Sequence, residues 1–169
     1  MKKYIDVFIT HAWRYHEDWL NICEIIDNYK IVEFRNFSIP WHDPGIDLHS
    51  KIGINFIEKG LKTQIYPADI FILLNSVYEI KNAKKWIELE LKYAKEFDIP
   101  IIGLPNSADG NLDKYIESHS DIVISWDKKI VIDSILTSAK SSQWYFTYQP
   151  MKFNSKFIVE KNGAEFELD

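Results

Sequence analysis

The stretch ADIFILL, residues Ala68–Leu74, is almost wholly apolar. A strand in a parallel sheet that is covered by helices on both faces has such a run, whereas a strand with one wet face alternates apolar and polar residues. Ala68–Leu74 is therefore predicted to be a central strand of a parallel sheet. A sheet of this kind needs helices on either side of it along the chain.

The rest of the chain up to about residue 141 alternates strands with helices. Further strands are predicted at Tyr4–Ile9, Lys30–Phe37, Ile99–Leu104 and Ile122–Ser125 from their apolar or alternating patterns. Between and after the strands, helical spacing of apolar residues predicts helices at about Tyr15–Tyr29, Leu48–Lys62, Asn82–Phe97 and Lys128–Ser141. A further short helix is predicted after Asn111 and ends at about Ser118. The expected class is α/β, a doubly wound parallel sheet of about five strands.

The C-terminal segment departs from this alternation. Trp144–Tyr148 reads as a strand, and Lys156–Glu160 and Ala164–Leu168 flank Asn162-Gly163, a strong hairpin signal. We expect a main domain at 1–141 and a β-rich extension at 142–169, with its hairpin packed on the domain.

Composition narrows the classes of function. The chain has 169 residues and a net charge of −5, which argues against a broad nucleic-acid-binding surface. It has no block of Lys and Arg and no apolar run long enough for a membrane span, and its N-terminus reads as a strand rather than a signal peptide. The single cysteine, Cys23, lies on an apolar helix face and is expected to be an inert buried thiol. A cytoplasmic protein is expected, without nucleic acid or membrane partners.

One carboxylate in the helix Asn82–Phe97 stands out. At 100° per residue, Glu90 points from the centre of the apolar arc, whereas Glu88 lies on the charged face with Lys92 four residues on. Burying an unpaired charge is costly, so Glu90 either pairs internally, sits at an oligomer interface or faces a cleft as a functional residue. Trp86 lies one turn earlier on the same face. It either packs in the core or holds a flat ring beside the carboxylate.

Ligands of doubly wound sheets bind beyond the carboxyl ends of the strands. Here those loops are Thr10–Tyr15, Ser38–Asp47, Asn75–Lys81 and Pro105–Asn111. They hold His11, His42 and Asp43, but no HxH or HExxH spacing supports a metal, and none is expected. Asp43, which precedes a proline, is also a common turn residue. Phosphate-loop, dinucleotide-loop and nucleophile-elbow motifs are absent from the sequence.

Four segments resemble TIR domains in the order that the family has them. DVFITHAW (Asp6–Trp13) resembles the family's opening strand, FSIPWHDP (Phe37–Pro44) lies where TIR domains have their BB loop, and ADIFILLNSVY (Ala68–Tyr78) resembles a strand that ends in serine. Trp86-Ile-Glu-Leu-Glu90 matches the W-x-x-x-E of TIR domains that cleave NAD. The pattern is most similar to TIR-like proteins of Thoeris-type bacterial antiphage systems, over roughly residues 4–140.

The resemblance implies a flavodoxin-like three-layer sandwich that cleaves the nicotinamide–ribose bond of NAD. In antiphage members the product is an ADP-ribose-type signal, often cyclic, which activates a separate effector. Carried over to this chain, Glu90 is the catalytic glutamate and Trp86 flanks the nicotinamide. The remaining NAD-binding positions implied are Thr10, His11, Ala12, Asp43 and Ser76.

The resemblance also implies a homo-oligomer in which Trp41–Pro44 of one copy helps to close the site of another. The chain lacks the Tyr-Arg that follows the first strand in animal TIR domains, and the hairpin has no counterpart. Cyclic, linear and base-exchanged products stay open. Two rival functions also stay open: a nucleoside deoxyribosyltransferase-like enzyme with a helix glutamate, and a non-catalytic interaction module.

Overall fold

The computed structural model describes residues 4–11, 16–38, 50–140, 158–161 and 164–167. Five strands form one parallel sheet in the order β2-β1-β3-β4-β5. The central strand β3 (Ile70–Leu74) is buried at every residue, as the apolar run predicted. The other strands are β1 (Tyr4–Ile9), β2 (Glu33–Asn36), β4 (Ile101–Leu104) and β5 (Ile122–Val123).

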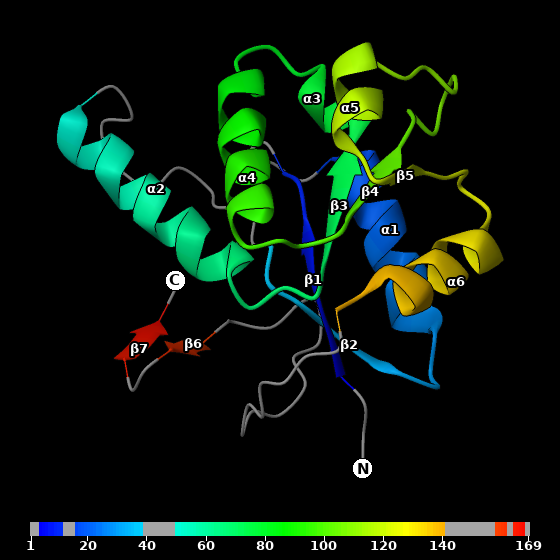
Figure 1. The fold of residues 1–169 in the computed structure, drawn as a ribbon, viewed down its shortest axis with the longest axis horizontal. Coiled ribbons are helices and arrows are strands. Elements are labelled where there is room, and N and C mark those ends of the chain that lie inside the picture. Colours follow the sequence, from blue (N-terminus) through cyan, green and yellow to red (C-terminus); the bar gives the residue numbers. More distant parts are fainter. Residues whose placement is uncertain (1–3, 12–15, 39–49, 141–157, 162–163, 168–169) are drawn as a thin grey trace.

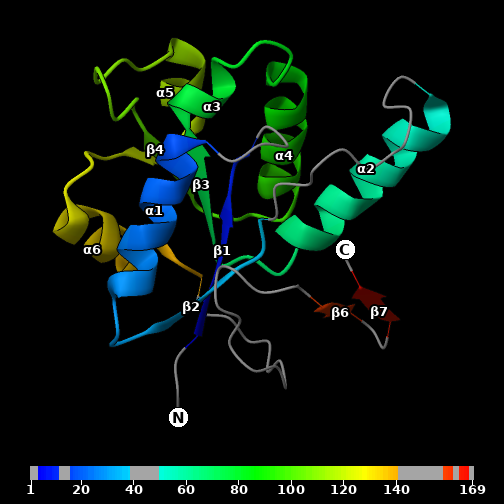
Figure 2. The ribbon, with the colours of Figure 1, turned by 180° about the vertical axis from the view of Figure 1, so that it is seen from behind.

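Helices cover both faces of this sheet (Figure 1). One layer contains α1 (Glu17–Asn28) and α6 (Lys128–Ser138), which contact each other. The opposite layer contains α2 (Lys51–Ile65) and α4 (Lys84–Glu96), also in mutual contact. Figure 2 shows the same two layers from behind. The predicted α/β class, with a five-stranded parallel sheet in a flavodoxin-like three-layer fold, is confirmed.

Two short helices complete the main body. The helix α5 (Lys114–His119) packs near β4. The helix α3 (Asn75–Tyr78) begins directly after β3, where the sequence had predicted only a loop. The Asn75 amide donates to Glu79 Oε1 at 3.0 Å within the turn, and its oxygen accepts the backbone N–H of the distant Asp113 at 2.7 Å. These bonds fix one helical turn that local sequence does not predict.

The C-terminal hairpin forms where Asn162-Gly163 predicted it. The strands β6 (Ile158–Lys161) and β7 (Ala164–Glu167) pair antiparallel and make their own two-stranded sheet. The other predicted strand of this extension, Trp144–Tyr148, lies outside the described residues. The packing of the extension on the domain therefore stays a prediction.

A charged cluster is buried in the amino-terminal half of the sheet. Arg35 on β2 faces Asp6 on β1, with Nε 2.5 Å from Oδ1 and Nη2 2.6 Å from Oδ2. Asp69 accepts the backbone N–H of Asp6 at 3.0 Å, and burial raises the pKa of Asp69 to about 6. The guanidinium carbon of Arg35 lies 5.1 Å from the centre of the Tyr4 ring. The cluster ties β1, β2 and the start of β3 together.

The lone cysteine is buried between α1 and β2, as predicted. The Cys23 Sγ accepts a weak hydrogen bond from Asn36 Nδ2 at 3.7 Å. Burial is the main reason that the pKa of the Cys23 thiol is raised. A thiol in this state is a poor nucleophile, because the thiolate is the reactive form.

Candidate functional site

Glu90 lies in the middle of α4 and is completely buried. Neither of its carboxylate oxygens makes a regular hydrogen bond. The backbone N–H of His11, just beyond the end of β1, faces the carboxyl group and favours its charged form. Burial has the larger effect and raises the pKa of Glu90 well above its usual range. The prediction that this carboxylate is buried on the apolar face of the helix is confirmed.

His11 brings a second buried polar group to the same place. Its side chain is fully buried, with its ring centre 5.9 Å from that of Phe8. Burial lowers the pKa of His11 to about 4, and the Gln64 side chain partly opposes this shift. The imidazole is therefore neutral at pH 7. Gln64, near the end of α2, is itself 5% exposed.

Thr10 joins the ends of two strands. Its hydroxyl oxygen accepts the backbone N–H of Leu74 at 2.9 Å, and its own N–H donates to the Ile72 carbonyl at 2.9 Å. The side chain is fully buried. The predicted NAD-binding role is untested, and the bond to Leu74 gives Thr10 a structural role.

We expect Thr10→Val to lower the free energy of unfolding by about 1–3 kcal/mol, because the buried N–H of Leu74 loses its acceptor. Urea unfolding of both proteins measures this difference. Thr137→Val is the matched control, because the Thr137 hydroxyl is exposed and donates only to carbonyls of its own helix. The control should change stability by less than about 0.5 kcal/mol. Equal effects of the two substitutions would contradict the role of Thr10.

Ser76 lies half-buried on α3, where it meets a residue that the sequence analysis had not considered. The Ser76 hydroxyl oxygen is 3.4 Å from His16 Nδ1. The same nitrogen accepts the backbone N–H of Asp18 at 3.2 Å and so caps α1. Histidine is not one of the residues that usually cap helices, and its contact with Ser76 spans 60 residues, so neither interaction has a local sequence signal.

Further polar bonds join the loops at the carboxyl ends of the strands. Asp18 accepts a hydrogen bond from the Ser107 hydroxyl, which links α1 to the loop after β4. Asn75 donates to Asn106 Oδ1 at 2.7 Å and links α3 to the same loop. The sequence predicted that these loops lie together at the carboxyl ends of the strands, but not that these side chains bond to one another, because none belongs to a recognisable motif.

Trp86 lies on α4 one turn before Glu90, as predicted. It is 9% exposed, and the amino group of Lys85 lies 5.3 Å from the centre of its ring. Burial to this degree agrees with the core-packing interpretation of Trp86 and leaves the contact with nicotinamide a prediction. Ala12 and Asp43 lie outside the described residues, as does the segment Trp41–Pro44.

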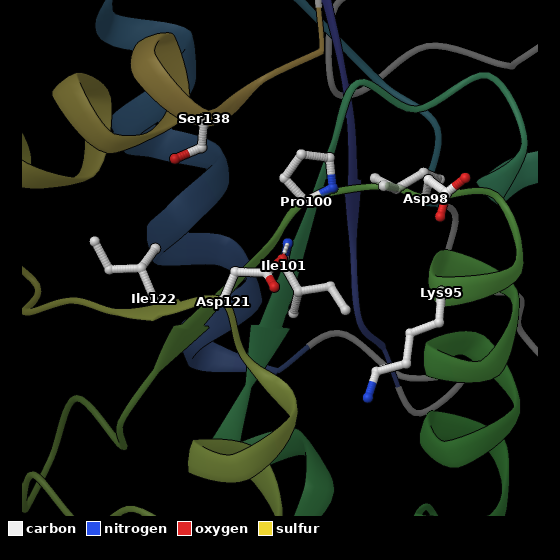
Figure 3. Close-up of a pocket in the computed structure, with 8 residues that line it drawn as sticks. Lys95, Asp98, Pro100, Ile101, Asp121, Ile122 and Ser138 are labelled. Atoms are coloured by element: carbon white, nitrogen blue, oxygen red, sulfur yellow. Dashed lines mark hydrogen bonds between the residues drawn. The ribbon is translucent and has the colours of Figure 1, made fainter.

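An open hollow of about 720 Å³ lies at the amino ends of the strands (Figure 3). Its walls include Pro100 and Asp121, just before β4 and β5, together with Lys95 near the end of α4 and Ser138 at the end of α6. Asp121 is already engaged, since Oδ2 accepts the backbone N–H of Ile101 at 2.8 Å. The residues that line this hollow include neither Glu90 nor His11 nor any residue of the loops at the carboxyl ends.

Within the described part of the chain, no three His, Cys, Asp or Glu side chains are grouped so that they could hold a metal ion. Among the helices described, none combines the length and the apolar character that crossing a bilayer requires.

Comparisons with known proteins give information on the fold but not on the function. No protein-family model matches the sequence, and a search of curated proteins finds no match. A solved structure of a conserved protein from Enterococcus faecalis V583 is similar, with a TM-score of 0.51 and 12% sequence identity. The match covers 79% of this chain and 98% of that one. At this identity the likeness concerns the fold alone, and it agrees with the α/β architecture.

Proposed function

We propose that this protein is a TIR-like enzyme that cleaves the nicotinamide–ribose bond of NAD. Its product would be an ADP-ribose-type signalling nucleotide, most simply a cyclic one, that a separate effector senses in antiphage defence. The observation that carries the proposal is Glu90: a completely buried carboxylate with no regular hydrogen bond, at the carboxyl edge of a parallel sheet. Stability alone gives no reason to keep a carboxylate there.

The chemistry asks little of the enzyme beyond charge and position. Nicotinamide leaves as a neutral molecule, and the ribose carbon becomes oxocarbenium-like. A carboxylate beside the ribose stabilises that positive charge, more strongly where water is excluded. Glu90 takes this role in the proposal, and the His11 backbone N–H supports its charged form. An adenine or ribose group of the same NAD as nucleophile yields a cyclic product, whereas water yields linear ADP-ribose.

The direct test is to incubate the purified protein with NAD and to separate the products by chromatography. Release of nicotinamide, with the other product identified by mass, supports the proposal. A deoxyribosyltransferase would leave NAD intact and exchange bases between deoxynucleosides. An interaction module would do neither, and either of these outcomes would overturn the proposal. The proposal includes NAD as substrate, no metal cofactor, no nucleic acid or membrane partner, and a cytoplasmic site of action.

We expect kcat/KM for NAD to rise with pH along a limb whose midpoint lies above the ordinary pKa of glutamate. Burial raises the pKa of Glu90, and only the deprotonated form can stabilise the cationic ribose. Well below the midpoint, the rate should fall about tenfold per pH unit. Initial rates of nicotinamide release across pH measure this limb. A limb that persists in the residual activity of Glu90→Gln would show that another group titrates.

We also expect activity to depend on assembly, because the TIR resemblance places a loop of one copy at the site of the next. Specific activity should rise with protein concentration, with light scattering in parallel to follow the oligomeric state. A rate per protomer that stays constant down to concentrations where only monomers are present would contradict this expectation.

A further inference from the structure

Three neighbouring strands, β1, β3 and β4, end at the same edge of the sheet, and side chains join the segments that come next along the chain. These segments are the first turn of α1, the short helix α3 and the loop after β4. Three pairs of residues make the links: His16 with Ser76, Asn75 with Asn106, and Asp18 with Ser107. Each segment is thus linked to both of the others, so a shift of one segment alone breaks two of the three links.

Asn75 lies at the centre of the bonds between α3 and the loop after β4. Its side chain is completely buried, and its amide nitrogen donates to Asn106 Oδ1 at 2.7 Å and to Glu79 Oε1 at 3.0 Å. Its oxygen accepts the backbone N–H of Asp113 at 2.7 Å, so both polar atoms of the side chain are bonded. The amide nitrogen of Asn106 in turn donates to Glu79 Oε2 at 2.9 Å. Asn75, Glu79 and Asn106, which each bond to the other two, are called the Asn75 cluster below.

The direction of every hydrogen bond in the Asn75 cluster follows from two groups that each have a single role. A carboxylate only accepts, so Glu79 must face the amide nitrogens of Asn75 and Asn106. A backbone N–H only donates, so that of Asp113 must face the oxygen of Asn75. Residues 105–113 contain neither helix nor strand, so these side-chain bonds decide where the loop after β4 lies.

The Asn75 cluster lies beyond the carboxyl ends of the strands, where ligands of such sheets bind, and Asn75 directly precedes Ser76. We propose that Asn75 is a positioning residue: it fixes α3 against the loop after β4 and so holds Ser76 in the place where NAD contacts it. The inference rests on the proposed function, in which Ser76 contacts NAD. The helix α4, which carries Glu90, contributes no residue to the cluster. Loss of the cluster should therefore weaken NAD binding more than it slows cleavage.

Asn75→Asp tests this inference, because aspartate keeps the size of the side chain and the acceptor for the Asp113 N–H but replaces the amide donor with an oxygen. KM for NAD should rise roughly tenfold or more, while kcat changes by less than about threefold. The loop itself gives a readout that needs no activity. The backbone N–H of Asn106 donates to the Asn111 carbonyl at 2.9 Å, and it should exchange roughly tenfold faster in hydrogen exchange followed by NMR.

Asn75→Asp combined with Glu79→Gln is the decisive variant, because it exchanges the roles of the two side chains. The new aspartate accepts, the new glutamine donates, and a half-turn of the Asn106 amide matches it to both. The number of hydrogen bonds and the net charge stay those of the parent. KM and the Asn106 exchange rate should return to within about threefold of the parent, whereas Glu79→Gln alone should raise both. Asn28→Asp is the control, because it makes the same change at an exposed position at the other end of α1 from His16.

Two results would overturn the inference. One is a parental KM in Asn75→Asp. The other is a double variant that recovers the Asn106 exchange rate but keeps a raised KM, because the cluster would then serve the fold alone. If Asn75→Asp does not fold, Glu79→Gln and the double variant make the same comparison. Faster exchange in the single variants and its recovery in the double variant, in a protein that never releases nicotinamide, would support the ordering of the loop by the cluster and refute the proposed function instead.

Discussion

Glu90→Gln should release nicotinamide from NAD at least about a hundredfold more slowly than the parent protein. Glutamine keeps the size of the side chain but removes the negative charge that stabilises the oxocarbenium-like ribose. Initial rates at saturating NAD measure this loss. A variant that folds and still turns over NAD at the parental rate would refute the catalytic role and leave Glu90 as a structural residue.

Stability should move in the opposite direction. The folded-state pKa of Glu90 is raised, so the folded protein binds the Glu90 proton more tightly than the unfolded chain does. The stability that this proton provides is present in full below the ordinary pKa of glutamate and is lost as pH rises through the folded-state pKa. Glutamine has no proton to lose and stays neutral at pH 7, so Glu90→Gln should melt at or above the parental temperature. A raised Tm together with lost activity is the signature of a residue retained for function.

Glu88→Gln is the matched control for both measurements. It changes the same residue type on the same helix, but Glu88 is exposed and accepts only a long hydrogen bond from the Tyr78 hydroxyl, at 3.5 Å. Rate and stability should both stay close to those of the parent. A rate loss similar to that of Glu90→Gln would show that the effect comes from α4 as a whole rather than from one carboxylate.

The second large effect concerns the buried cluster of Asp6, Arg35 and Asp69. We expect Arg35→Met to lower the free energy of unfolding by about 3–5 kcal/mol, because Asp6 remains buried without its positive partner. The loss should be smaller in acid, where Asp6 and Asp69 are protonated, since burial raises the pKa of both carboxyls. Urea unfolding at neutral and at acidic pH measures the difference.

Lys129→Met provides the comparison. Lys129 also pairs with a carboxylate, that of Asp133, but this pair lies on the surface with the lysine side chain 84% exposed. Its loss should leave unfolding unchanged within error, because solvent screens such pairs. Equal stability of Arg35→Met and the parent at neutral pH would show that the buried cluster contributes nothing to the fold.

The sequence predicted the features that depend on the pattern of apolar residues within a single helix or strand. The burial of β3 on both faces follows from an unbroken apolar run, and the inward direction of Glu90 follows from a periodicity of 3.6 residues; both are local properties. Contacts between distant segments could not be predicted in the same way. Asp6 and Arg35 each lie within an unremarkable strand, and only the register of β1 on β2 brings them together.

The same limit applies to the candidate site. Glu90 was identified because a carboxylate interrupts an apolar arc, and His11 because it follows a strand. Gln64 also interrupts the apolar face of its helix, which is the same kind of local signal. His16 and Ser76 come together because β1 and β3 pair side by side in parallel, so that the segments after their carboxyl ends meet, and no local pattern reveals this.

The buried state of Cys23 has a practical consequence for labelling. The chain has one cysteine, and its thiol is enclosed and has a raised pKa, so maleimide reagents should leave the native protein largely unmodified. A cysteine introduced on the exposed face of α4, such as Lys92→Cys, would then be the main attachment point for a fluorophore or spin label. With a second cysteine introduced on the exposed face of α2, the distance between the two probes would report on the packing of α2 against α4, with every native core residue kept.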